Sequence, residues 1–189
     1  VIGLVVPNLR KIDIFFLLQH VTILKCPYLG KTMKSNPDTP VIGLLNENNI
    51  QYQCHEFEYL PGGGTSRSSN VLNIDEHSVV KTLVFETSDR KPLIVLMHGD
   101  MKVNTKELAR ILSVKKITSC SPETAESWSG WVVGSTNPFL LKTQMPVYAE
   151  NSIQELDKIW INGGGRGVLV EIAPQVLTEL VRPIWVQIG

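Results

Sequence analysis

The feature that most constrains the fold of this chain is a series of short apolar segments. Helix signals follow only some of them. Segments rich in β-branched residues, or alternating apolar with polar residues, are typical of strands. By these signals we predict about seven or eight short strands, over residues 50–58, 77–86, 92–97, 131–133, 147–149, 158–162, 167–172 and 184–188.

Helix signals are fewer than strand signals. Thr39 before Pro40 supplies a capping hydroxyl and a proline at the first helical position, and Asn104 with Glu107 forms a capping box. Further short helices are predicted over 65–72, from Ser121 onward and over 174–180. Because helices do not follow every strand, a regular parallel βαβ fold is disfavoured. We predict an α/β (α+β) domain with a mixed, curved sheet or partial barrel.

Residues 1–32 differ from the rest of the chain. The first methionine is Met33, and the apolar run at 12–18 is interrupted by Gln19 and His20, which makes it too short for a membrane span of about 20 apolar residues. No Ala-x-Ala-like cleavage site follows it. We expect residues 1–32 to be an N-terminal extension outside the domain, such as translation from upstream of the natural start, and residues 33–189 to be one domain.

Charge and cysteine usage exclude several classes of protein. The formal net charge is +0, and without the four Lys/Arg and one Asp of residues 1–32 the remainder has 14 Lys/Arg and 17 Asp/Glu, or −3. Tight binding to nucleic acid through phosphates needs a basic surface, so a DNA-binding protein is excluded but brief contact with an RNA end is not. Three widely spaced cysteines and four scattered histidines favour a cytoplasmic protein without disulfides, metal or cofactor, acting away from membranes.

A lysine interrupts the apolar strand predicted at 77–86. Burying an ammonium group there is costly unless it is paired, so Lys81 is expected to face a cavity or a carboxylate. The alternative is a half-exposed strand face, where the lysine stem packs against the sheet and its head stays in water.

Two glycine-bearing segments are further candidates for a site. Backbone N–H groups of Gly134-Ser135-Thr136-Asn137-Pro138 are suited to a nest for an anion or a carbonyl, the alternative being a plain loop. The glycines of 162–167 lack the spacing of a dinucleotide fingerprint, and a strand follows them instead of a helix. In that segment Arg166 either contacts a phosphate or carboxylate, or forms a structural ion pair.

Nucleophile–base pairs are not evident in the sequence. Cys54 and His55 are neighbours on a predicted strand, so their side chains point to opposite faces and a catalytic Cys54 is disfavoured. The Gly-x-Ser-x-Gly elbow of serine hydrolases is missing as well.

Taken in order, these three segments resemble the YbaK family of editing domains, which is related to the domain inserted in bacterial prolyl-tRNA synthetases. The resemblance consists of a Val-x-Lys-Thr-Leu strand at 79–83, a Gly-x-x-x-Pro loop at 134–138 and a Gly-x-Arg-Gly turn at 164–167. It covers nearly all of 33–189. No single motif is specific, but the three in this order and at this spacing are.

The resemblance implies a single-domain pseudo-barrel with short flanking helices and an enzyme that hydrolyses the ester joining an amino acid to the 3′ end of tRNA. It implies Cys-tRNA(Pro) as the first substrate, with the substrate's own thiol as nucleophile, and the tRNA 3′ end and prolyl-tRNA synthetase as partners. The alternatives are a deacylase for Ala or Ser, or a non-catalytic module that binds tRNA or a synthetase.

The resemblance also implies the roles of individual residues. Lys81 would be the catalytic cation, and the amides of Gly134, Ser135 and Thr136 would hold the scissile carbonyl and its oxyanion. Further substrate-binding residues would be Tyr52, Phe57, Thr82, Asn137, Pro138, Asn162, Gly164 and Arg166.

Four positions depart from the family pattern. Ser135 replaces a second glycine, and Leu140 stands where a glycine is common, which we expect to stiffen or narrow the entrance of the pocket. Leu169 stands where an acid is frequent, and Asn162 where some members have serine. The amino acid removed therefore need not be cysteine.

Overall fold

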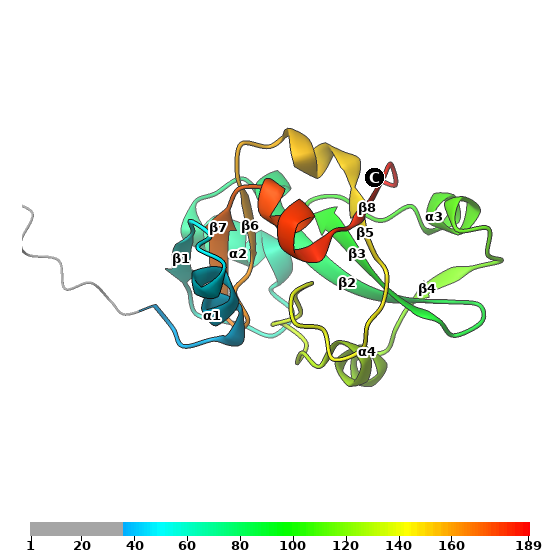
Figure 1. The fold of residues 1–189 in the computed structure, drawn as a ribbon, viewed down its shortest axis with the longest axis horizontal. Coiled ribbons are helices and arrows are strands. Elements are labelled where there is room, and N and C mark those ends of the chain that lie inside the picture. The colour runs from blue at the N-terminus through cyan, green and yellow to red at the C-terminus, as the bar shows by residue number, and fades with distance from the viewer. Residues whose placement is uncertain (1–35) are drawn as a thin grey trace, which may run out of the picture. The chain divides into compact units, whose positions relative to one another are not determined.

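One mixed sheet organises the computed structural model, which describes residues 36–189 (Figure 1). The strand order is β1-β7-β6-β2-β3-β5-β8, with β4 paired to β2. The predicted extension 1–32 lies outside the described residues. The strands are β1 (Gln53–Glu56), β2 (Val79–Thr87), β3 (Pro92–His98), β4 (Ile117–Ser119), β5 (Val147–Glu150), β6 (Ile159–Asn162), β7 (Val168–Ile172) and β8 (Ile184–Val186).

Short helices flank this sheet, and the predicted capping residues begin them. The Thr39 hydroxyl accepts a hydrogen bond from the Ile42 N–H, and Asn104 and Ser121 cap their helices in the same way. None of the described helices is long and apolar enough to cross a membrane. The helices are α1 (Pro40–Glu47), α2 (Gly64–Leu72), α3 (Thr105–Ile111) and α4 (Pro122–Ser129), with the shorter turns η1 (Glu76–Ser78), η2 (Asn151–Glu155) and η3 (Leu177–Val181).

The predicted mixed α/β class is confirmed, but individual elements differ from the prediction. The predicted strand at 131–133 is wrong, because Val132 and Val133 lie in an exposed loop without a partner strand. Strand β4 was not predicted, because a three-residue segment after two lysines carries little apolar signal. The isolated turn η2 also lacked a signal.

The core lies on both faces of the central strands. Along β3, Ile94 and Leu96 point to one face and pack with α1 and η3, whereas Val95 and Met97 point to the other and pack with α3. A strand buried on both faces reads as a continuous apolar run, which is why 92–97 was recognised so readily. Strand β2 also contributes to both faces, but it is interrupted at Lys81 and Thr82 by half-buried side chains.

One edge of β2 has partners only at its two ends. Strand β6 runs parallel to it at Val79 and Val80, and β4 runs antiparallel to it at 85–87. Among the described residues, no strand pairs with that edge in between. The Val84 carbonyl on the edge accepts a hydrogen bond from the Cys120 N–H. Backbone groups alternate between the two edges of a strand, so Thr82 directs its N–H and C=O into the gap.

Candidate active site

A cavity of about 480 Å³ surrounds the open edge of β2. On one side it is bounded by the segment 57–68, which leads into α2, and on the other by 119–125 and the loop 133–136. All residues of β2 from Val79 to Val84 contribute to its wall. A molecule in this cavity therefore meets both faces of a strand and the main-chain groups between them.

Lys81 lies on the cavity wall and its ammonium group is held by main-chain oxygens. Its Nζ donates to the Gly99 carbonyl at 2.8 Å and also to the Met101 carbonyl. Burial lowers the pKa of Lys81 below its usual value of 10.5, although the nearby carboxylates of Glu76 and Asp100 oppose that shift. An ammonium group has three N–H donors, so one is left for a ligand. Lys81 thus lines the cavity, and its ammonium group is directed to the turn that follows β3.

Thr82 offers polar groups that have no protein partner among the described residues. Its hydroxyl is buried without a hydrogen bond, and its peptide groups point into the gap in the sheet. An unsatisfied buried polar group costs about 1–3 kcal/mol. A ligand or a bound water that reached the hydroxyl would remove that cost.

Two residues of the loop at 134–138, Gly134 and Thr136, line the cavity, and their backbone N–H groups have no hydrogen-bond partner in residues 36–189. Gly134 has φ +93°, and a Cβ there would lie 2.6 Å from the Tyr59 hydroxyl. Glycine is therefore required both by the backbone conformation and by the close approach of Tyr59.

The remaining residues of this loop turn inward and hold it together. The Ser135 N–H and hydroxyl both donate to the Val132 carbonyl, at 2.9 and 2.8 Å. Asn137 is fully buried, and its side chain bonds the Ser135 carbonyl and the Phe139 N–H. The Ser135 amide is therefore already occupied and is not free to stabilise an oxyanion, which corrects the expectation from the family motif.

Residues of the segment 162–167 support the loop at 134–138. The Asn162 amide donates to the Gly134 carbonyl at 3.2 Å and to the Gly165 carbonyl at 3.1 Å, so it joins the two glycine segments. Arg166 donates to the Val133 carbonyl at 3.0 Å and stacks over the Tyr59 ring. Among residues 36–189, Arg166 has no ion-pair partner, and it does not line the cavity; its position fits a support for the loop.

Two basic side chains lie on the cavity wall, and one of them, Arg67, is paired with Glu58 at 3.4 Å. Lys81 and Arg67 are the charged residues on the described wall, which has no Asp, Glu or His. Cys120 is the thiol on the wall, but burial raises its pKa to about 11, so it is protonated at neutral pH. A cavity of this kind can hold an anion and stabilise a developing negative charge, but it cannot supply a nucleophile–base pair.

Half of the predicted site residues meet at the cavity and the others do not. On its wall lie Lys81, Thr82, Gly134, Thr136, Phe57 and Asn162. Away from the wall lie Tyr52, Ser135, Asn137, Pro138, Gly164 and Arg166.

Some of the residues away from the wall have evident structural roles. The Tyr52 hydroxyl bonds Asn46 in the first helix, and a Cβ at Gly164 would meet Val41 at 2.9 Å. Leu140 also lies off the cavity wall, so the expected narrowing of the entrance is not observed.

Several residues of the cavity wall lie outside the three sequence motifs. Tyr59, Thr65 and Arg67 come from the segment before and within α2, and Leu169 comes from β7. The glycine run at 62–64 marked a loop there but did not indicate a site. Leu169 is 6% exposed and makes the wall apolar at the position where the resemblance led us to expect an acid.

Comparison with known proteins identifies similar chains. Residues 64–180 match the family model described as the aminoacyl-tRNA editing domain. The protein EbsC of Enterococcus faecalis, described as a candidate Cys-tRNA(Pro)/Cys-tRNA(Cys) deacylase, is 24% identical over 148 residues, which are 78% of this chain and 90% of that one.

Two further similarities concern prolyl-tRNA synthetases. The proline–tRNA ligase of Maridesulfovibrio salexigens is 27% identical over 146 residues, covering 76% of this chain, but the chain spans only 24% of that ligase. A crystal structure described as a candidate trans-editing enzyme for prolyl tRNA synthetase superposes with a TM-score of 0.66 at 17% identity, over 81% of this chain and 99% of that one. At this identity the likeness shows the fold alone.

Proposed function

The chain belongs to the aminoacyl-tRNA editing domain family, and we propose that it is a trans-acting deacylase that hydrolyses mischarged aminoacyl-tRNA in the cavity around β2. The enzyme class follows from the family, and the substrate and mechanism are our proposal. We further propose that it acts in the cytoplasm, on the 3′ end of tRNA, in transient complexes that include prolyl-tRNA synthetase.

The arrangement of three unoccupied donors around one cavity carries the proposal. Lys81 has one N–H left after binding two carbonyls, and the amides of Gly134 and Thr136 have no partner among the described residues. We assign the two amides to the scissile carbonyl, where they stabilise the oxyanion of the tetrahedral intermediate. We assign Lys81 to the terminal ribose or its phosphate, which matches a cavity without acidic residues.

The open strand edge is suited to the amino acid itself. The Thr82 carbonyl can accept a hydrogen bond from the α-ammonium group, and the partnerless Thr82 hydroxyl can meet a small polar side chain. Leu169 closes the apolar part of the wall. We infer that a small residue is removed, with Cys-tRNA(Pro) as the first substrate and the Ala or Ser esters as the alternatives.

The lack of a base on the described wall favours attack by the substrate. With cysteine, its sulfur forms a bond to its own carbonyl carbon, the ester C–O bond breaks, and the thiol proton goes to the departing ribose oxygen. Water then opens the resulting thiolactone to release cysteine. For alanine or serine the nucleophile would be a ribose hydroxyl or a bound water. The protein supplies orientation and electrostatic stabilisation in each case.

A panel of mischarged tRNAs tests this function. Purified protein would be incubated with Cys-, Ala- and Ser-tRNA(Pro) and with correctly charged Pro-tRNA(Pro), and release of the amino acid would be followed. We expect hydrolysis of at least one mischarged ester and survival of Pro-tRNA(Pro). Binding of tRNA or synthetase without hydrolysis of any ester would refute the enzyme and support the non-catalytic module.

A further inference from the structure

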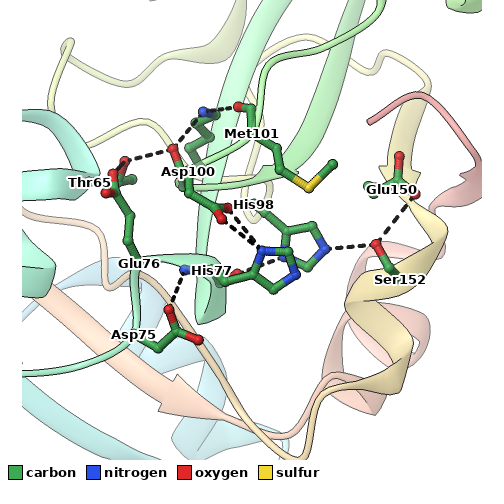
Figure 2. A network of polar contacts seen from close by, with 11 residues as sticks. Thr65, Asp75, Glu76, His77, His98, Asp100, Met101, Glu150 and Ser152 are labelled. Carbon is green, nitrogen blue, oxygen red and sulfur yellow. Dashed lines mark hydrogen bonds and ion pairs between the residues drawn. The ribbon is translucent and has the colours of Figure 1, made fainter.

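A polar network surrounds the turn that follows β3, whose carbonyls bind Lys81 (Figure 2). The two carbonyls that hold the ammonium, those of Gly99 and Met101, belong to the turn that leaves β3. A Cβ at Gly99 would lie 2.6 Å from the Glu76 carbonyl, so this turn is pressed against η1. The position of the ammonium therefore depends on whatever fixes the turn.

His98 fixes the turn at its start. The side chain is fully buried, its Nδ1 lies 2.6 Å from the His77 carbonyl, and its Nε2 lies 2.9 Å from the Ser152 hydroxyl. Because a carbonyl only accepts, Nδ1 must carry the proton; in the neutral ring Nε2 is then an acceptor for the Ser152 hydroxyl, whose other acceptor is Glu150 at 3.4 Å. Burial lowers the pKa of His98 and favours that neutral form.

His77 holds the middle of the same turn. Its ring stacks on His98 with centroids 3.8 Å apart and an interplanar angle of 11°. Its Nδ1 lies 3.0 Å from both carboxylate oxygens of Asp100, the residue between the two carbonyls that bind Lys81. Figure 2 shows the Asp100 carboxylate turned toward His77.

These contacts assign His77 and His98 a role that no motif predicts. We propose that the stacked pair is a positioning device for Lys81: His98 fixes the turn whose carbonyls hold the ammonium, and His77 keeps the Asp100 carboxylate from pairing with it. Without His77, the Asp100 carboxylate would be free to compete with the substrate for the cation. This inference rests on the proposed role of Lys81 in the deacylase.

Other charged groups surround the pair and enter any change with pH. Glu76 on η1 accepts a hydrogen bond from the Thr65 hydroxyl at 2.8 Å. Glu150 at the end of β5 lies 3.4 Å from the Ser152 hydroxyl and accepts the Ile188 N–H at 2.7 Å. Asp75 caps η1 through the His77 N–H, and Lys102 follows the turn. None of these groups replaces His77 as the partner of Asp100.

The test measures the pKa of Lys81 directly as well as turnover. Competitive acetylation, read by peptide mass spectrometry between about pH 8 and 11, gives the pKa of an individual lysine without any need for activity. His77→Ala frees Asp100, so the pKa of Lys81 should rise. The double variant His77→Ala/Asp100→Asn should show no rise. The matched control His55→Ala removes a histidine paired with Glu171, away from the cavity, and should change nothing.

Substitution of His98 separates positioning from simple structural loss. His98→Asn keeps a donor for the His77 carbonyl and should retain most of the rate. His98→Leu keeps the bulk without a donor and should lower kcat by up to about 100-fold at near-normal KM. If His98→Leu does not fold, the partly exposed His77 still carries the test.

The outcomes distinguish this inference from the proposed function. Active wild-type enzyme whose Lys81 pKa and kcat are the same in His77→Ala as in the control would overturn the positioning role alone. Wild-type protein that hydrolyses no aminoacyl-tRNA, but whose Lys81 pKa rises in His77→Ala, would remove the deacylase function and leave the positioning role standing.

Discussion

The two sides of the cavity, around Lys81 and around Gly134, present different chemical groups. On the Lys81 side, the chemistry lies in a side chain whose position depends on other side chains, the histidines and carboxylates around the turn that binds it. On the Gly134 side, it lies in backbone amides, and the side chains of Asn137, Asn162 and Arg166 only hold the loop in shape.

This difference predicts how substitutions on each side should affect activity and stability. On the Lys81 side, the identity of one side chain matters and its backbone is ordinary strand. On the Gly134 side, backbone conformation matters, and a change acts by moving the loop. Substitutions on the first side should therefore separate activity from stability more cleanly than substitutions on the second.

The largest expected effect is that of Lys81→Ala. Removing the cation should lower deacylation by more than about 10³-fold, because the other cation on the described wall, Arg67, is paired with Glu58. Two carbonyls lose a partner, so stability should fall by only about 1–2 kcal/mol. Turnover and thermal unfolding would be measured beside Lys91→Ala, an exposed lysine. Wild-type turnover in Lys81→Ala would exclude the lysine from the site.

Gly134→Ala tests the backbone side. The new Cβ would meet the Tyr59 side chain at a positive φ, so the amides should move away from the oxyanion position and the rate should fall by about 10²–10³-fold. Stability should also fall, by about 1–2 kcal/mol. Gly43→Ala is the matched control, because a Cβ there has nothing within 4 Å and alanine favours a helix. Unimpaired turnover in Gly134→Ala would contradict the assignment of the loop amides to the oxyanion and with it the contrast between the two sides.

Lowering the pH should destabilise the folded protein through His98. The pKa of His98 is lowered in the folded protein from an ordinary value of 6.5, so below about pH 6.5 the unfolded chain takes up a proton that the folded chain resists. The free energy of unfolding should decrease as the pH falls from that point toward the lowered pKa. Urea unfolding between about pH 5 and 7 would measure it. The slope should be shallower in His98→Asn, and equal slopes would contradict the assignment.

Leu140→Gly should give a small gain in stability. Leu140 has φ +52° and is 52% exposed, so glycine relieves a backbone strain of about 1–2 kcal/mol and loses little buried area. The greater freedom of glycine in the unfolded chain offsets about 0.5–1 kcal/mol. Urea unfolding should show a net gain of up to about 1 kcal/mol with unchanged turnover. A loss of stability would mean that Leu140 packs more than its exposure indicates.

Deleting residues 1–32 should have the smallest effect. The predicted domain begins at Met33, and both sides of the cavity come from residues 57–169. We expect the truncated protein to keep the turnover and unfolding midpoint of the full chain. Aggregation of the truncated protein would show that the extension belongs to the domain.

The fold was predictable in outline because its signals are local. Thr39-Pro40 and Asn104 begin helices whose caps depend on residues three positions away, and the buried run at 92–97 marks a central strand. The segment 131–133 was mispredicted because the preference of valine for strands reflects packing against a neighbour, which Val132 lacks.

The site was predictable only as far as its motifs extend. The motifs indicated Lys81 and Gly134 as candidates, but they did not indicate the partners that position these residues. The carbonyls that bind Lys81 come 18 and 20 residues later, and Tyr59 meets Gly134 from a distant loop. The gap in the pairing of β2 is a tertiary property, because it depends on where β6 and β4 begin and end.

That gap also bears on how such a domain can evolve. It leaves one strand position empty beside Thr82, and strands lie about 4.8 Å apart, so the space admits something flat and extended. A ligand bound there by main-chain contacts is held whichever side chains surround it. Exchanging neighbours such as Leu169 would then change which amino acid is rejected while leaving those main-chain contacts intact. A lineage could acquire a new specificity in a few substitutions, within the limit set by the packing of buried residues such as Leu169.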